Sequence, residues 1–299
     1  MGLAFDGTRL AVATRTQIVE FRNQPRAGKR IPPFGKHDAC FLPRRTHTTG
    51  DIRGHEMAWI GDDLWIVNTR FSCLCTIEPD YSFVPKWRPS FISALAAEDR
   101  CHLNGMAIID DKPKYVTSLG MADTRHGWRE NSALGGRLLD VDSGEPVASG
   151  LSMPHSPRWY ADQLWVLESG RGTIATVEIA DGTLTTVATL PGFTRGLEFL
   201  GPYAFVGLSQ VRESAIFSGI PLAESNEERY CGVGVVDIRN GTTVAFLRFE
   251  DAVQEVFAVQ ILAGMRYPEI RNEANDLEKL ISGSFVVPNV SSKDVTRPT

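Results

Sequence analysis

The chain has 299 residues, of which 42% are hydrophobic, and a formal net charge of −5. This is enough apolar material for a sizeable core, and the acidic balance excludes a charge-driven nucleic-acid or anionic-membrane partner. No stretch reaches the roughly 20 apolar residues of a membrane span, and the N-terminus lacks the plan of a signal peptide. The five cysteines are few and odd in number, which argues against a disulfide framework. Their pattern predicts a cytoplasmic protein.

Short apolar strands joined by tight turns recur along the chain. In chain order, such hairpins are predicted from residues 2, 54, 103, 154 and 194, with the turn sequences FDG, GDD, DDKP, YADQ and LGP. A second kind of hairpin follows several of them, as in GRLLDVDSGEPVASG, TIATVEIADGTLTTVATL and VGVVDIRNGTTVAFLRF. Two hairpins per unit predict a four-stranded antiparallel sheet.

The units recur every 40 to 60 residues or so, which is typical of propeller blades. We count five clear units and a sixth that begins near EVFAVQILAGMRYPEI. The sequence therefore predicts an all-β, six-bladed β-propeller, a single domain over residues 1–299, with inner strands near residues 2, 57, 106, 157, 197 and 257. A β-sandwich would not explain the repeat.

The sixth blade is predicted to be incomplete, because no second hairpin follows Glu269. Either the segment GSFVVPN closes the ring or the last blade is short. An unpaired strand edge leaves backbone groups without partners. We therefore expect residues 256–299 to be the least stable part of the fold.

Polar side chains stand where the first strand of a hairpin begins or its partner ends. His155 lies between two prolines in MPHSPRWY, and His55, Asn104 and Arg195 begin other inner strands. Because blades are arranged radially, these positions gather on one face around the central channel. The candidate site residues are His55, Glu56, Asn68, Arg70, His102, Asn104, His155, Arg158, Arg195 and Arg212.

Two chemistries fit this set. Imidazoles and carboxylates could hold a divalent metal, with His55, Asn104 and His155 as ligands and His55, His102, His155 and Glu56 as catalytic groups. Guanidiniums could clamp an anion, with Arg70, Arg158, Arg195 and Arg212 assisted by Asn68. The alternative is structural, because a Gly-His pair such as Gly54-His55 can support blade packing. The polar loop 123–130 is either solvated or a lid; we expect His126 in solvent and leave Trp128 open.

Several motifs are similar to those of a bacterial family of uncharacterised proteins that carry a domain of unknown function. They are VNTRFSCL, WRPSFISALAAEDRCHLNGMA, LSMPHSPRWY, LPGFTRGLEFLGPYAFVGLSQVRES and CGVGVVDIRNG, and the resemblance runs from residue 1 to about 270. It implies a propeller-like fold and no established activity. Members of that family carry a further N-terminal stretch, whose absence here would explain an incomplete blade.

The segment HLNGMAIIDD more remotely resembles the Asn-Gly strand start of gluconolactonase and strictosidine-synthase propellers, which carries a metal ligand in calcium-dependent members. That resemblance implies Asn104 as a ligand and Glu56 as its acidic partner. His55, His155 and Arg195 replace the expected oxygen ligands, so calcium does not fit.

Two functions follow. One is a metal-dependent, lactonase-like hydrolase acting on a small anionic substrate. The other is a non-catalytic propeller that binds a ligand or peptide.

Overall fold

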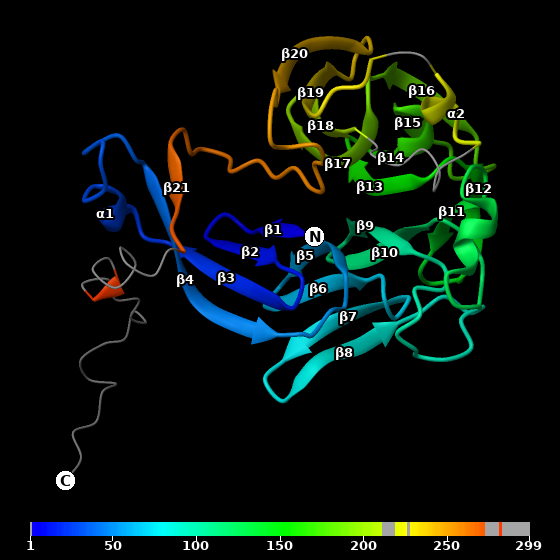
Figure 1. Cartoon of the computed structure of the whole chain (residues 1–299), viewed down its shortest axis with the longest axis horizontal. Coiled ribbons are helices and arrows are strands. Elements are labelled where there is room, and N and C mark those ends of the chain that lie inside the picture. The colour runs from blue at the N-terminus through cyan, green and yellow to red at the C-terminus, as the bar shows by residue number, and fades with distance from the viewer. Residues whose placement is uncertain (1, 211–218, 226–227, 273–280, 283–299) are drawn as a thin grey trace.

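The computed structural model describes residues 2–210, 219–225, 228–272 and 281–282. Its strands form five sheets, which we call blades 1 to 5 (Figure 1). Blade 1 contains β1 (Leu3–Phe5), β2 (Arg9–Ala13), β3 (Gln17–Asn23), β4 (Ala39–Thr48) and β21 (Pro268–Ile270). Blade 2 contains β5 (Gly54–Ile60), β6 (Asp63–Asn68), β7 (Cys73–Glu78) and β8 (Tyr81–Trp87).

Blade 3 contains β9 (Leu103–Ile109), β10 (Lys112–Ser118), β11 (Gly136–Asp140) and β12 (Pro146–Leu151). Blade 4 contains β13 (Pro154–Tyr160), β14 (Gln163–Glu168), β15 (Thr173–Val177) and β16 (Leu184–Thr189). Blade 5 contains β17 (Phe193–Leu200), β18 (Tyr203–Ser209), β19 (Gly232–Asp237) and β20 (Thr242–Arg248). The helices are short: α1 (Pro25–Gly28), α2 (Pro221–Glu224) and the 3₁₀ turns η1 (Gly127–Asn131) and η2 (Ser169–Arg171).

The antiparallel four-stranded blades confirm the propeller prediction, but the predicted number of blades was wrong. The described residues form five blades, not six. The inner strands predicted near residues 2, 57, 106, 157 and 197 are β1, β5, β9, β13 and β17. The sixth, predicted near residue 257, does not form: residues 253–262, which we call the strap, carry no strand. The segment GSFVVPN lies outside the described residues.

The strap is held by a few hydrogen bonds to the end of β18 instead of by the ladder of a sheet. Ser209 Oγ accepts a hydrogen bond from the Val256 N–H at 2.9 Å, and the Gln210 N–H donates to the Gln254 carbonyl at 2.9 Å. After the strap the chain leaves the channel, and β21 pairs in parallel with β4, the outer strand of blade 1. The residues that were expected to build a sixth blade therefore extend the first one.

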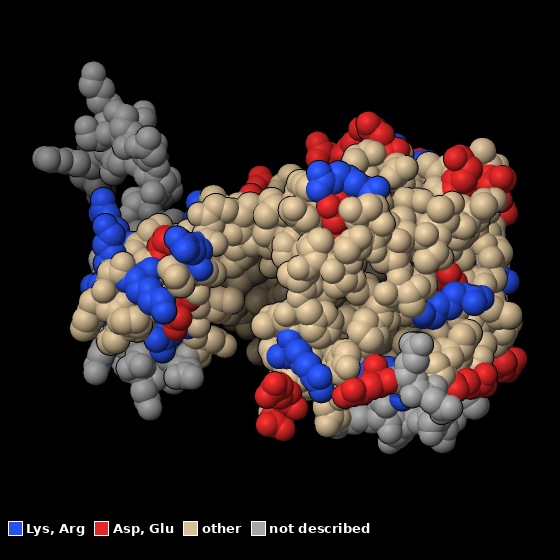
Figure 2. Space-filling view, turned by 90° about the horizontal axis from the view of Figure 1, so that it is seen from above, with Lys and Arg blue, Asp and Glu red and all other residues tan. Residues whose placement is uncertain are grey.

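The hydrophobic core lies between neighbouring blades. One cluster joins blades 4 and 5 through Trp165 and Leu197, and equivalent clusters join blades 1 and 2, 2 and 3, and 3 and 4. At the remaining junction the end of the strap packs on blade 1, where Leu262 and Met265 contact the cluster around Phe21. The strap thus takes the place of a blade between blades 5 and 1. Figure 1 shows it running from β20 past β17 and β1 to β21, and in Figure 2 the surface is hollowed along this stretch.

A small apolar cap covers the channel at the end where the inner strands begin. It joins the loop around η1 to the loop around α2 and is made of Leu119, Trp128, Met153, Phe193, Ile220 and Leu222. Trp128, left open by the sequence, is buried in it. No helix in the described parts of the chain is long and apolar enough to cross a membrane.

Four inner strands carry an extra residue near their start. In β5, β13 and β17 two residues stand opposite one residue of the partner strand, and β9 has a register shift at the same level. Such β-bulges turn side chains away from the regular alternation and are common next to functional sites. The bulged segments are Gly54–Met57, Leu103–Gly105, His155–Arg158 and Thr194–Leu197.

Candidate functional site

A cavity of about 290 Å³ lies on the axis of the propeller, lined by the five inner strands and the strap. Most of its polar residues come from the bulged starts of the inner strands, and two come from the later part of β17 and from the strap. The polar lining is His55, Glu56, Asn104, His155, Ser156, Arg158, Arg195, Glu198 and Gln260. The aromatic lining, which was not predicted, is Phe5, Trp59, Trp159 and Phe257.

The structure brings the three predicted imidazoles together. The ring centroid of His55 lies 5.4 Å from that of His102 and 5.6 Å from that of His155. The cap packs behind them, since Trp128 lies 4.4 Å from His102, centroid to centroid. His55 and His155 therefore line the cavity, and His102 lies between them and the cap, outside the cavity lining. The sequence placed the three imidazoles at an open mouth, because it did not predict the cap.

His155 is held in one tautomer by the chain in front of it. Its Nδ1 lies 2.9 Å from the carbonyl oxygen of Met153, and a carbonyl can only accept, so Nδ1 carries a proton. Burial, assisted by the nearby Arg195 cation, holds the pKa of His155 well below 6.5. The ring is therefore neutral at physiological pH, and its Nε2 is an acceptor without a proton.

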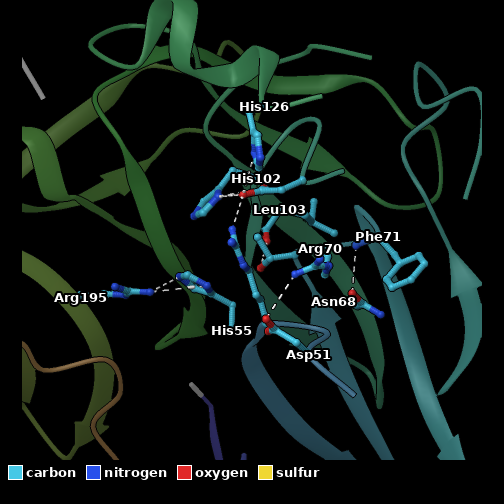
Figure 3. A network of polar contacts seen from close by, with 12 residues as sticks. Asp51, His55, Asn68, Arg70, Phe71, His102, Leu103, His126 and Arg195 are labelled. Carbon is cyan, nitrogen blue, oxygen red and sulfur yellow. Dashed lines mark hydrogen bonds and ion pairs between the residues drawn. The ribbon is translucent and has the colours of Figure 1, made fainter. Parts of the chain in front are cut away.

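Arg195 points at His55 from the opposite wall. Its Nη2 donates to Nε2 of His55, and its guanidinium carbon lies 4.4 Å from the centre of the Phe257 ring on the strap (Figure 3 shows the Arg195–His55 pair). Burial and the adjacent cation hold the pKa of His55 well below 6.5, so His55 is neutral as well. Burial also lowers the pKa of Arg195 to about 10, which leaves it charged at neutral pH.

Arg195 differs from the other cavity cation in its partners. Arg158 forms an ion pair with Glu56, whose other oxygen accepts the Met106 N–H at 2.7 Å. Among the described residues no carboxylate forms an ion pair with Arg195, and its Nε is buried without a hydrogen-bond partner. Glu255 and Glu56 act on Arg195 only through longer-range attraction, so the cavity contains one guanidinium with a contacting carboxylate and one without. Glu56, predicted as catalytic, is engaged by Arg158.

His102 belongs to a buried ionic cluster behind the cavity. Its Nδ1 lies 3.0 Å from both carboxylate oxygens of Asp99, which also accepts from Arg53 at 3.0 Å (Figure 3). His126, expected in solvent, is half-buried with its Nδ1 3.8 Å from Asp99. Sequence reasoning missed Asp99; the available signal was an acidic residue three positions before a histidine in AEDRCH.

The remaining predicted residues fall in three places. Asn104 lines the cavity: its Oδ1 accepts the Thr117 hydroxyl at 2.6 Å, and its Nδ2 is buried without a protein partner among the described residues. Asn68 and Arg70 do not line it, because they lie at and just after the end of β6, the second strand of blade 2, and the cavity is lined by the inner strands. Asn68 accepts the Phe71 N–H at 3.0 Å and Arg70 pairs with Asp51 at 3.3 Å (Figure 3). Arg212 lies outside the described residues.

The donor set does not converge as a metal site would require. In the described ranges no group of three His, Cys, Asp or Glu side chains is arranged to hold a metal ion. Arg195 also occupies the approach to Nε2 of His55, the nitrogen that a cation would need. The ligand set of His55, Asn104 and His155 therefore stays a prediction.

Similarity to solved structures is low in sequence and modest in geometry. A structure of the nidogen/laminin complex matches with a TM-score of 0.45 and 11% identity, covering 82% of this chain and 78% of that chain. The computationally designed protein Ika8 matches with a TM-score of 0.40 and 13% identity, over 87% and 64%. Hydrazine synthase of Kuenenia stuttgartiensis matches with a TM-score of 0.41 and 12% identity, over 68% and 51%. The chain thus spans less than two thirds of the last two.

The comparison with curated proteins found no match. A family model described as a domain of unknown function, DUF4915, matches residues 1–271. This is the kind of family that the sequence motifs resemble, and the relation to gluconolactonase-type propellers stays an analogy. The propeller of five blades, with its histidine- and arginine-lined channel, therefore belongs to the DUF4915 family.

Proposed function

We propose that the channel binds a small organic anion and that Arg195 is its principal contact. The observation that carries this proposal is the guanidinium of Arg195, which lines the cavity, stays charged and has no carboxylate partner among the described residues. An uncompensated buried charge is costly, and such groups are normally paired. An anion in the cavity would supply a directly contacting partner.

The surroundings favour an anion over a cation or a neutral ligand. His55 and His155 are neutral, so neither competes with Arg195 for the negative charge. Asn104 lines the same cavity, and its buried Nδ2 has no protein partner among the described residues. A guanidinium binds carboxylates and phosphates well, because its planar donors match their oxygens.

The size of the cavity limits the ligand. The volume of about 290 Å³ is at the lower end of the roughly 300–1,000 Å³ that is typical of small-molecule pockets. This supports a small monoanion over a long peptide. The carboxylate end of a peptide offers the same chemistry, and the experiment below includes it.

The proposal is tested by calorimetric titration of the protein with propionate, inorganic phosphate and the dipeptide Gly-Gly. Removing the charge in Arg195→Gln should weaken propionate binding by about tenfold or more, the usual loss for a charge-assisted hydrogen bond. Arg195→Lys keeps the charge and should retain part of the affinity. Arg239→Gln, in the turn after β19 where Arg239 pairs with Asp237, is the matched control and should bind like the wild type.

Three results would overturn the proposal. The wild-type protein could bind none of these anions, propionate could bind equally to Arg195→Gln, or Gly-Gly could bind while propionate and phosphate do not. The last result would assign the channel to a peptide terminus.

A further inference from the structure

The cavity carries a hydrogen-bond acceptor beside its anion-binding group. Nδ1 of His155 is committed to Met153, and the Ser169 hydroxyl lies 3.1 Å from the same nitrogen. Both contacts are behind the ring, at the start of blade 4. The opposite nitrogen, Nε2, has no hydrogen-bond partner among the described residues, while His155 itself lines the cavity. The Met153 carbonyl fixes the ring proton on Nδ1, and burial beside the Arg195 cation disfavours a second proton, so Nε2 is the accepting nitrogen.

The acceptor and the guanidinium act on one small volume. His55 contacts Arg195 through Nε2, and its ring centroid lies 5.6 Å from that of His155. A ligand whose carboxylate meets Arg195 therefore places the atoms next to that carboxylate near His155. The chemistry of those atoms decides whether Nε2 gains a hydrogen-bond partner from the ligand.

We propose that the ligand is a 2-hydroxycarboxylate, whose carboxylate contacts Arg195 and whose hydroxyl donates to Nε2 of His155. This rests on the proposed anion-binding function and adds the class of ligand. A hydroxyl is a donor, so it satisfies the acceptor. A 2-oxo group is an acceptor only, so it would face the lone pair of Nε2 and be rejected. A plain carboxylate leaves Nε2 without a partner.

A 2-amino group is the other donor that could stand in this position. It would be an ammonium, and it would lie beside the positive charge of Arg195. Two carboxylates line the cavity and both are engaged: Glu56 pairs with Arg158 and accepts the Met106 N–H, and Glu198 accepts from the Gln260 amide at 2.9 Å. The arrangement therefore favours the hydroxy acid over the amino acid.

The test compares four ligands of nearly equal size: lactate, propionate, pyruvate and alanine. Calorimetric titration of the wild-type protein should give lactate about tenfold tighter binding than propionate, the gain from satisfying one buried acceptor. Pyruvate and alanine should bind more weakly than propionate. His155→Phe keeps a ring of similar size without the acceptor, and it should bring the ratio of lactate to propionate affinity close to one.

Ser169→Ala is the matched control, because it removes the other polar contact of Nδ1 and leaves Nε2 and the Met153 bond in place. It should keep the preference for lactate. If His155→Phe does not fold, the ¹⁵N shift of the imidazole in wild-type protein replaces it. Lactate should move the His155 Nε2 signal toward that of a hydrogen-bonded acceptor, and propionate should not.

The outcomes separate the two proposals. Equal affinity for lactate and propionate, both lost in Arg195→Gln, would overturn the hydroxy-acid inference and leave anion binding intact. A preference for lactate that survives in His155→Phe, or an Nε2 signal that lactate does not move, would overturn the role of His155. Absence of binding by all four ligands would overturn both proposals.

Discussion

The carbonyl oxygen of Met153 lies 2.9 Å from Nδ1 of His155, so the residue just before β13 sets the tautomer of an imidazole inside the cavity. Met153 has a left-handed backbone with φ of 50°, which turns the chain at the start of the blade. A short local contact thereby determines what the cavity offers to a ligand.

The stability of the protein should fall on mild acidification. His55 and His155 have pKa values well below 6.5 when folded, and unfolding returns them to about 6.5. As the pH drops below 6.5 the unfolded state binds the extra protons, so the free energy of unfolding decreases by up to about 1.4 kcal/mol per histidine and pH unit. Urea unfolding between pH 7.5 and 5 should show this slope, and His155→Phe should show a smaller one. Identical pH profiles would contradict the neutral, buried state of His155.

Asp99 should matter more for stability than an ordinary surface carboxylate. Its side chain is buried and joins Arg53 and His102, each at 3.0 Å. Asp99→Asn removes the charge from this cluster and should cost about 1–3 kcal/mol in the free energy of unfolding. Asp51→Asn, at the more exposed pair with Arg70, is the control and should cost less than about 1 kcal/mol. Chemical denaturation of the two variants checks the order, and equal losses would speak against a buried ionic cluster.

Gly196 should be essential for seating the strap. It has φ of 80°, and an added Cβ would lie 2.7 Å from the Val259 nitrogen and 2.8 Å from the Ala258 Cα. Gly201, in the turn after β17, has φ of 55° and open space around it. Both alanine variants bear the left-handed backbone cost of about 1–2 kcal/mol, but only Gly196→Ala also displaces backbone. Thermal unfolding should therefore show a clearly larger loss for Gly196→Ala; the reverse order would mean that the strap is not packed there.

The strap should open independently of the blades. Ser209 Oγ bonds the Val256 N–H at 2.9 Å and the Val256 carbonyl at 3.2 Å. Segments held by few backbone bonds open with a low free energy, so amides of residues 255–262 should exchange faster than those of β17 and β18. Ser209→Ala should accelerate exchange in the strap while leaving β9 and β10 unchanged. Exchange in the strap as slow as in β18 would show that it is an integral part of blade 5.

Much of the blade architecture could be predicted from the sequence, because hairpins are short-range structures. Turn residues such as those in GDD and the DG and NG dipeptides set the strand ends, and alternating apolar residues set the faces. The same reasoning brought His55, His102, His155 and Arg195 to one point, because equivalent positions of radial blades meet at the axis. The turn residues and the repeat are visible in short stretches of sequence, so they predict the strand ends and the equivalent positions of the blades.

The tertiary structure decided the number of blades and the ion pairing and burial of the site residues. The apolar residues of the strap resemble a strand in sequence. In the structure residues 256–262 are half-buried, and the Val256 backbone bonds the Ser209 side chain instead of a neighbouring strand. Likewise Arg158 is neutralised by Glu56, and His102 is held by Asp99 and covered by Trp128. Ring closure, ion pairing and burial depend on which distant segments meet, and a local pattern does not specify that. Which guanidinium has a contacting carboxylate was therefore visible only once the chain was folded.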